Sequence, residues 1–311
     1  MGTSDFAVPA LRATAAVCDI AAVVTRPDRP RGRGQALAAS AVARIGEQLR
    51  VPVMKPEDVN APDARAALAA LAVDLFAVVA FGAILSPAML ALPRLGAINL
   101  HGSLLPDYRG ASPVQRALWD GCLGTGVTTL WMDEGIDTGD LVLQRWVAIE
   151  PHDDAGSLAA RLAEAGGPLL AESLVLAHAG AARRQPQERA AGSYARKLGK
   201  SEGVVDWGLD ADTVWHRQRA MTPWPGAATA LRDKRLLLVR TQPQHRLPLG
   251  VVPGTVIEAG RETVVVACSV GALRLITVRP EGHADQAAAD WARGARLQPG
   301  DRMSIAKEAH A

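Results

Sequence analysis

Residues 74–80 (DLFAVVA) and 96–100 (GAINL) decide the fold, because each is a short apolar run beside turn residues. Runs of this kind, rich in Val, Ile and Leu, are typical of strands that are buried on both faces of a sheet. Upstream, residues 20–25 (IAAVVT) and 51–54 (VPVM) predict two more strands. Helical composition falls between or beside the strands, at 37–48, 61–72 and 86–91. This alternation predicts an α/β domain with a mostly parallel sheet and helices on both faces.

The same pattern continues to about residue 180, and then the chain changes character. Ser112 and Pro113 are typical of the start of a helix, predicted at 112–120. The next expected elements are strands at 126–133 and 140–149 and a helix at 155–179. We therefore expect a first domain at 1–180, a basic linker at 181–200 and a second domain at 201–311.

The second domain is predicted to begin with a helix at 210–221 and to continue as short strands. The strands are expected at 227–231, 235–240, 254–258, 262–267 and 272–278. Five short strands separated by turn signals favour a small β-barrel.

Composition excludes several classes of protein. The 311 residues are 49% hydrophobic and 21% charged, so the chain is neither disordered nor fibrous. Its longest apolar run, at 67–83, is interrupted by Asp74, and no leader is evident, so we expect a cytoplasmic protein without membrane spans. The cysteines, Cys18, Cys122 and Cys268, lie far apart, which predicts neither a metal site nor a disulfide framework.

Charge gives only a local indication of a partner. The net charge is +2, which does not by itself indicate nucleic acid. Residues 26–34 (RPDRPRGRG), however, contain Arg26, Arg29, Arg31 and Arg33, and two prolines and two glycines predict an irregular, flexible loop. Guanidinium groups bind phosphate and stack on bases, but a solvated basic loop is an equally good interpretation. The loop lacks the Gly-x-Gly-x-x-Gly pattern of dinucleotide-binding proteins.

Two stretches carry candidate chemistry. In 96–113 (GAINLHGSLLPDYRGASP), Asn99 and His101 share one face at the carboxyl end of a predicted strand, where open α/β sheets bind ligands. In 131–144 (WMDEGIDTGDLVLQ), Asp137 begins a turn between two strands. A single histidine after a strand is more often structural, and Asp137 can equally be a turn cap. Neither stretch is specific alone.

Together, N-x-H-G-S-L-L-P-x-x-R-G and D-x-G-x-D-T-G-D resemble the folate-dependent formyltransferases. Further motifs extend the resemblance over nearly the whole chain, including GTSDFAVPAL (2–11), VPVMKPEDVN (51–60) and RAMTPWPGA (219–227). The resemblance implies a Rossmann-like catalytic domain followed by a small OB-like barrel. It also implies 10-formyltetrahydrofolate as the formyl donor, and the α-amine of methionine on initiator tRNA as the acceptor.

The resemblance assigns roles to named residues. Asn99, His101 and Asp137 fall on the catalytic trio, and the folate-binding loop falls on Ser103, Leu104, Leu105 and Pro106. The basic loop at 26–34, together with Lys197 and Lys200 of the linker, is expected to hold the RNA, with the chain acting as a monomer. The residue types suit the chemistry, because an amide and an imidazolium can donate to the oxyanion that forms when an amine attacks a formyl carbon. A carboxylate beside the imidazole can help to move the proton.

One departure and several alternatives remain at this stage. The resemblance implies a strand before Gly2, which the chain as given does not contain, so we expect either an upstream start or an exposed slot in the sheet. An amino-sugar nucleotide or glycinamide ribonucleotide is an alternative acceptor for the same chemistry. A non-catalytic RNA-binding protein and a nicotinamide dehydrogenase are alternatives of other classes, and the intact trio and the absent glycine fingerprint count against them.

Overall fold

The computed structural model describes residues 1–31, 36–188, 190–245 and 250–306, and its contacts divide into two units. Unit 1 contains Met1–Pro113, Gly124–Ala148 and Ala159–Arg196. Unit 2 contains Val114–Leu123, Ile149–Leu158 and Lys197–Ala311. Two short stretches from the first half of the chain therefore group with the C-terminal residues, and each unit is described separately.

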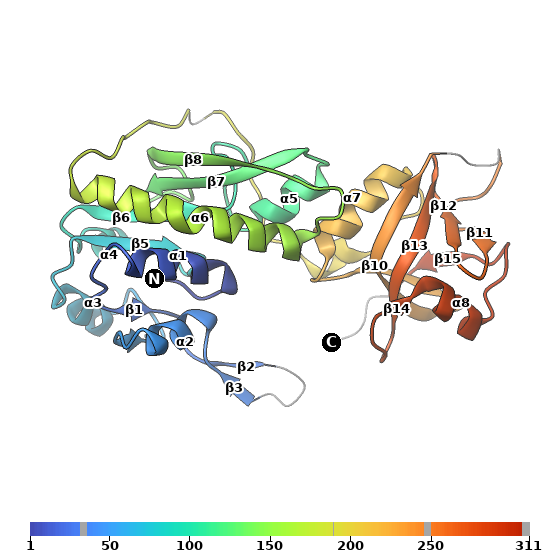
Figure 1. Ribbon diagram of the computed structural model, residues 1–311, viewed down its shortest axis with the longest axis horizontal. Coiled ribbons are helices and arrows are strands. Elements are labelled where there is room, and N and C mark those ends of the chain that lie inside the picture. Colours follow the sequence, from blue (N-terminus) through green and yellow to red (C-terminus); the bar gives the residue numbers. More distant parts are fainter. Residues whose placement is uncertain (32–35, 189, 246–249, 307–311) are drawn as a thin grey trace. The chain divides into compact units, whose positions relative to one another are not determined.

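The main sheet of unit 1 has the order β5-β6-β7-β8 (Figure 1). Its strands are β5 (Leu75–Val79), β6 (Gly96–His101), β7 (Gly124–Trp131) and β8 (Leu141–Ala148). β5 and β6 are parallel, as are β1 (Val23–Val24) and β4 (Val53–Met54). β7 and β8 are antiparallel to their neighbours, so the prediction of a mostly parallel sheet is wrong for this half. A short connection between two strands, such as residues 132–140, requires antiparallel pairing.

The helices of unit 1 begin at residues that suit a helix N-terminus. The helices are α1 (Val8–Ala15), α2 (Ala41–Gln48), α3 (Pro62–Ala69), α4 (Pro87–Leu90) and the greater part of α6 (Ala155–His178). The Ser40 hydroxyl accepts the Ala43 amide ahead of α2, and the Ser86 hydroxyl accepts the Met89 amide ahead of α4. All of these except α1, which follows a short 3₁₀ turn at Asp5–Ala7, were predicted from the sequence.

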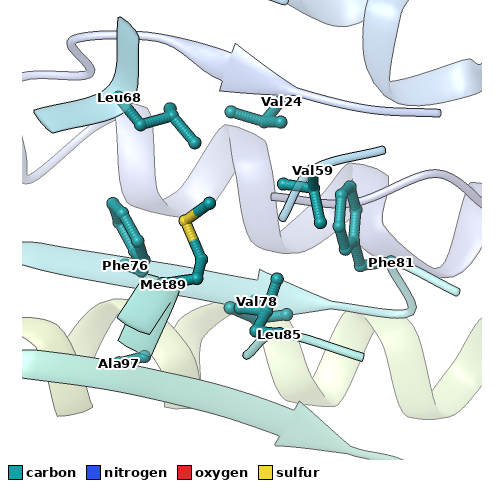
Figure 2. Close-up of a cluster of buried hydrophobic side chains, with 9 residues drawn as sticks. All are labelled: Val24, Val59, Leu68, Phe76, Val78, Phe81, Leu85, Met89 and Ala97. Atoms are coloured by element: carbon teal, nitrogen blue, oxygen red, sulfur yellow. The ribbon is translucent and has the colours of Figure 1, made fainter. Parts of the chain in front are cut away.

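A buried apolar cluster holds α3 and α4 against the sheet (Figure 2). Phe76 and Val78 are two residues apart in β5, so their side chains lie on the same face of the sheet. Met89 of α4 is fully buried in the same cluster. The cluster consists of Val24, Val59, Leu68, Phe76, Val78, Phe81, Leu85, Met89 and Ala97. The cluster fixes the position of β5, and the parallel pairing of β5 with β6 in turn fixes where β6 ends.

Between β1 and β5 lies a slot that the described residues fill only in part. At the carboxyl ends of β1 and β5 the first two residues close this slot. The Gly2 amide donates to Val24 O at 2.9 Å, and the Val79 amide donates to Met1 O at 2.9 Å. Beyond them is a cavity of about 620 Å³, bordered by residues 20–24, 73–77, α1 and α6. The Met1 amine donates to Ala77 O, and burial lowers the pKa of this amine to about 5.

The basic segment near residue 30 is partly a β-ribbon. β2 (Arg29–Arg31) pairs with β3 (Ala36–Ala38) in antiparallel register, with Arg29 opposite Ala38. The prediction of an irregular loop is therefore wrong for these residues. The prolines of the segment argued against a strand, because proline is unusual within sheets except at edges.

Unit 2 contains a curled antiparallel sheet with the order β11-β12-β13-β10-β9-β15, and β14 pairs with β13. The strands are β9 (Ala227–Leu231), β10 (Lys234–Gln244), β11 (Val256–Ala259), β12 (Val264–Ala267), β13 (Ala272–Pro280), β14 (Gln286–Ala287) and β15 (Met303–Ile305). An antiparallel bridge between Thr255 and Arg302 links the two end strands, so the sheet curls toward closure.

The helical elements of unit 2 are α5 (Pro113–Trp119) apart from its first residue, η2 (Lys200–Gly203), α7 (Ala211–Met221) and α8 (Ala288–Ala295). The Asp210 side chain caps α7 by accepting the Thr213 amide, which lowers the pKa of the Asp210 carboxyl. Among the residues described in either unit, no helix is long and apolar enough to cross a membrane.

Candidate functional site

Asn99 and His101 lie at the carboxyl end of β6, between the parallel strand β5 and the antiparallel strand β7. The side chain of His101 is buried, with 6% of its surface exposed, whereas Asn99 is half-buried. The end of β6 thus presents an amide and an imidazole from the same edge of the sheet, as the spacing of the two residues predicts.

Asp137 reaches this pair from the connection between β7 and β8. Its Oδ1 accepts a hydrogen bond from Asn99 Nδ2 at 3.2 Å, and its Oδ2 lies 3.4 Å from His101 Nδ1. The Gly110 amide donates to the same Oδ2 at 2.9 Å. The structure therefore brings together three side chains that lie up to 38 residues apart in the sequence.

Asp133, not Asp137, caps the turn in this connection. Its Oδ1 accepts the Gly135 amide at 3.0 Å and the Thr138 hydroxyl at 2.8 Å, which is the pattern of an Asx turn. The interpretation of Asp137 as a turn cap is therefore wrong. With the turn held by a neighbouring acid, the Asp137 carboxylate is directed to Asn99, His101 and Gly110.

Both ring nitrogens of His101 have partners. Nε2 lies 2.9 Å from Tyr108 O, and a carbonyl oxygen only accepts, so Nε2 carries a proton. Nδ1 faces Asp137, and a second proton there would give an imidazolium paired with the carboxylate. The ring is thus held between a backbone carbonyl on one side and an acid on the other.

The predicted folate loop forms a buried bend beside the trio. The Ser103 hydroxyl donates to Asp107 O at 2.6 Å, and Ser103 and Leu105 are buried while Leu104 and Pro106 are half-buried. Thr128 and Gln144 hold the bend through three hydrogen bonds. The Thr128 hydroxyl donates to Ser103 O at 2.6 Å and accepts the Leu105 amide at 3.1 Å. Gln144 Nε2 donates to Leu105 O at 2.7 Å. The loop is therefore shaped by β7 and β8 and not by its own residues alone.

Sequence reasoning missed the contribution of residues 185–195, which we call the strap; residue 189 lies outside the described residues. Ser193 O accepts the Arg109 amide at 2.9 Å, and the Ala195 amide donates to Arg109 O at 2.6 Å. Gln187 contacts the Asp137 turn from the same segment. No local pattern reveals these contacts, because the partners are about 50 to 85 residues away. Most of the predicted linker thus packs on the site.

The predicted RNA-binding residues are divided between the two units. Arg26 is exposed and donates to Gly82 O at 3.0 Å, and Arg29 is exposed in β2, 3.9 Å from Glu57. Arg31 ends β2, and Arg33 falls outside the described residues. Lys197 and Lys200 are exposed in unit 2.

The arrangement suits acyl transfer to an amine. An amide nitrogen carries two protons, and Asp137 takes only one of those on Asn99, so the other can donate to an oxyanion. Asp137 contacts both other members, which places it to exchange a proton through His101. No group of three or more metal-ligating side chains occurs within the residues that the structure describes.

Two family profiles match the chain. The first, described as formyl transferase, matches residues 4–174, and the second, described as the C-terminal domain of formyl transferase, matches residues 197–296. The chain is 41% identical over 304 residues to a methionyl-tRNA formyltransferase of Geobacter metallireducens, covering 97% of each protein. It is 44% identical over 312 residues to a protein of that name from Heliobacterium modesticaldum, covering 97% of this chain and 98% of the relative.

Solved structures share the fold at low sequence identity. An N-formyltransferase from Helicobacter canadensis, solved with folinic acid and dTDP-3-aminofucose, gives a TM-score of 0.64 at 16% identity over 88% of this chain and 96% of that one. HypX from Aquifex aeolicus, solved with tetrahydrofolic acid, gives a TM-score of 0.60 at 20% identity over 87% of this chain and 46% of that one.

Proposed function

The chain belongs to the formyl transferase family, and from this premise we propose that it formylates methionyl initiator tRNA. The donor is 10-formyltetrahydrofolate, and the product, N-formylmethionyl-tRNA, starts translation. The observation that carries the proposal is the 41–44% identity, over almost the full length of both chains, to proteins named methionyl-tRNA formyltransferase. The finer parts of the proposal are the identity of the donor, action in the cytoplasm and a monomeric working form.

In the proposed reaction the methionyl α-amine attacks the formyl carbon, and the bond from that carbon to N10 of the folate breaks. The free N–H of Asn99 donates to the oxygen as it becomes an oxyanion, and His101, when protonated, adds a positive charge that favours the oxyanion. Asp137 holds His101 and helps to carry the proton from the attacking nitrogen to the leaving nitrogen. The contacts at 3.2 Å and 3.4 Å to Asp137 support these roles, because each group lies within reach of the next.

We assign the donor to the bend at Ser103–Pro106. The bend begins two residues after the trio residue His101 and ends five residues after it, and β7 and β8 hold its shape through Thr128 and Gln144. Neighbours of the same fold were solved with folinic acid or tetrahydrofolic acid, which supports a folate as the ligand.

We assign the RNA to the exposed basic residues. Arg26 and Arg29 present exposed guanidinium groups that suit phosphates and unstacked bases, and Lys197 and Lys200 add charge in unit 2. The bridge between Thr255 and Arg302 supports an OB-like barrel in unit 2, a type of platform that commonly binds single strands.

A formylation assay tests the proposal. The purified chain is incubated with 10-formyltetrahydrofolate and one of three acceptors: methionyl initiator tRNA, methionyl elongator tRNA or a dTDP-amino sugar. We expect formylated product with the initiator tRNA and at least about tenfold slower reaction with the other two. Transfer to the amino sugar alone would assign the trio to another acceptor, and no transfer to any amine would contradict the proposed chemistry.

A further inference from the structure

Gln187 uses its whole side-chain amide to join the Asp137 turn to Arg109. Its Nε2 donates to Asp137 O at 3.0 Å and to Gly139 O at 2.7 Å. Its Oε1 accepts from Arg109 Nε at 3.1 Å and from Arg109 Nη2 at 2.9 Å. Two donor and two acceptor contacts engage both ends of a primary amide, so this side chain is fixed.

Arg109 is itself anchored to the strap. Its Nη1 donates to Ala191 O at 3.2 Å, its Nη2 donates to Glu188 O at 3.2 Å, and its backbone pairs with Ser193 and Ala195. Gln187 therefore links the Asp137 turn to a side chain that is itself held by further hydrogen bonds.

The Asp137 backbone needs such support. Its φ is +54°, in the left-handed region that residues other than glycine rarely occupy and that costs about 1 kcal/mol or more. The carbonyl of this strained residue is one of the two that Gln187 holds. Loss of that contact is therefore expected to let the backbone relax toward an ordinary φ and to turn the carboxylate away from His101.

The strap also holds the other side of His101. The Ser193 hydroxyl accepts the Tyr108 amide at 3.0 Å, and Tyr108 O is the partner of His101 Nε2. One segment of chain thus fixes the carbonyl on one side of the imidazole and the acid on the other.

From these contacts we propose that Gln187 is a positioning residue for formyl transfer, acting by holding Asp137 against His101. The expected change in kcat rests on the proposed function. The expected change in the position of the Asp137 turn does not depend on it. Gln187 touches neither reacting group, and its effect passes through Asp137.

Three variants test the proposal. Gln187→Ala removes all four contacts, and Gln187→Glu keeps the acceptor for Arg109 but cannot donate to the two carbonyls. Gln185→Ala is the matched control, since Gln185 lies in the same segment and its exposed side chain has no hydrogen bond among the described residues. We expect both Gln187 variants to lower kcat by about 10–100-fold, with KM for the tRNA within about threefold of wild type, and the control to be unchanged. Normal kcat in Gln187→Glu would overturn the proposal.

A double-mutant cycle separates positioning from a general structural role. If Gln187 acts through Asp137, then Gln187→Ala costs at most about threefold in an Asp137→Asn background. The same loss in both backgrounds would overturn the proposal.

Amide exchange provides a readout that does not depend on catalysis. The Gly110 amide is bonded to Asp137 Oδ2, so we expect its exchange, followed by NMR, to be at least about tenfold faster in Gln187→Ala than in wild type or Gln185→Ala. Equal exchange would overturn the proposal. An inactive wild type with faster Gly110 exchange in the variant would reject the proposed function while supporting the positioning role.

Discussion

The two sides of the β5–β6 pair are built very differently. On the β7 side, polar groups are closely partnered and the packing leaves little space, since a Cβ at Gly126 would lie 2.5 Å from a Leu104 methyl carbon. On the β1 side, Met1 and Gly2 bridge β1 and β5 by backbone hydrogen bonds, and a cavity of about 620 Å³ lies beyond them. Both sides belong to unit 1.

The difference shows where this fold requires precision. The candidate chemistry lies entirely on the β7 side, where β8, the strap and the Asp137 turn all contribute partners to a few groups. Displacement of a catalytic group by about 1 Å can lower the reaction rate about 100-fold, so the dense packing on the β7 side has a functional reason. The β1 side carries none of the candidate trio, and defects there affect the free energy of unfolding more than the site.

The largest effect on the rate should follow the loss of a charge on the β7 side. Asp137→Asn keeps the size of the side chain and removes the carboxylate, and we expect formyl transfer to fall at least about 100-fold, because proton movement and imidazolium pairing are both lost. The thermal midpoint should change little, since the side chain is near the surface, with 16% exposed. The measurement is single-turnover formylation under saturating tRNA.

Asp133→Asn is the control for that experiment. Asp133 is in the same connection and bonds Gly135 and Thr138, and asparagine can cap the same turn. We expect its rate to stay within about threefold of wild type. A near-normal rate in Asp137→Asn, or an equal loss in Asp133→Asn, would remove the special role of Asp137.

The same contrast explains how much could be predicted from sequence. Strands β5 and β6 were located within one residue at either end, because their apolar runs are continuous and bounded by turn residues. The convergence of Asn99 and His101 followed from a period of two along one strand. These features depend on local pattern, which a single sequence displays.

Features that depend on long-range contact could not be predicted. Gln187 resembles any polar residue of a linker, and its role follows from carbonyl groups 48 and 50 residues away. Similarly, the sequence shows Asp133 and Asp137 as two acids that each lie two residues before a glycine, and only their hydrogen bonds in the fold decide which one caps the turn. The two-residue pairing of Met1–Gly2 is too short for any periodic signal.

A smaller effect, on stability, should follow loss of a hydroxyl on the dense side. Thr129 is fully buried in β7, and its Oγ1 accepts the Leu143 amide at 3.1 Å and lies 2.7 Å from the Ser173 hydroxyl of α6. Thr129→Val keeps the shape but removes the acceptor of the Leu143 amide and one partner of the Ser173 hydroxyl, so we expect the free energy of unfolding to fall by about 1–3 kcal/mol. Urea denaturation measures this change, and an unchanged midpoint would contradict the view that this side is fully satisfied.

The smallest effect, of opposite sign, is expected for the same substitution beside the cavity. Thr14 of α1 is 8% exposed, lines the cavity, and has a buried hydroxyl without a partner among the described residues. Thr14→Val removes the unpaired hydroxyl at constant shape, so we expect the free energy of unfolding to rise by about 1 kcal/mol, measured under the urea conditions used for Thr129→Val. Formyl transfer should be unchanged, because the side chain lies on the β1 side. A loss of stability in Thr14→Val as large as that in Thr129→Val would mean that the two sides are equally well satisfied, and the contrast between them would fail.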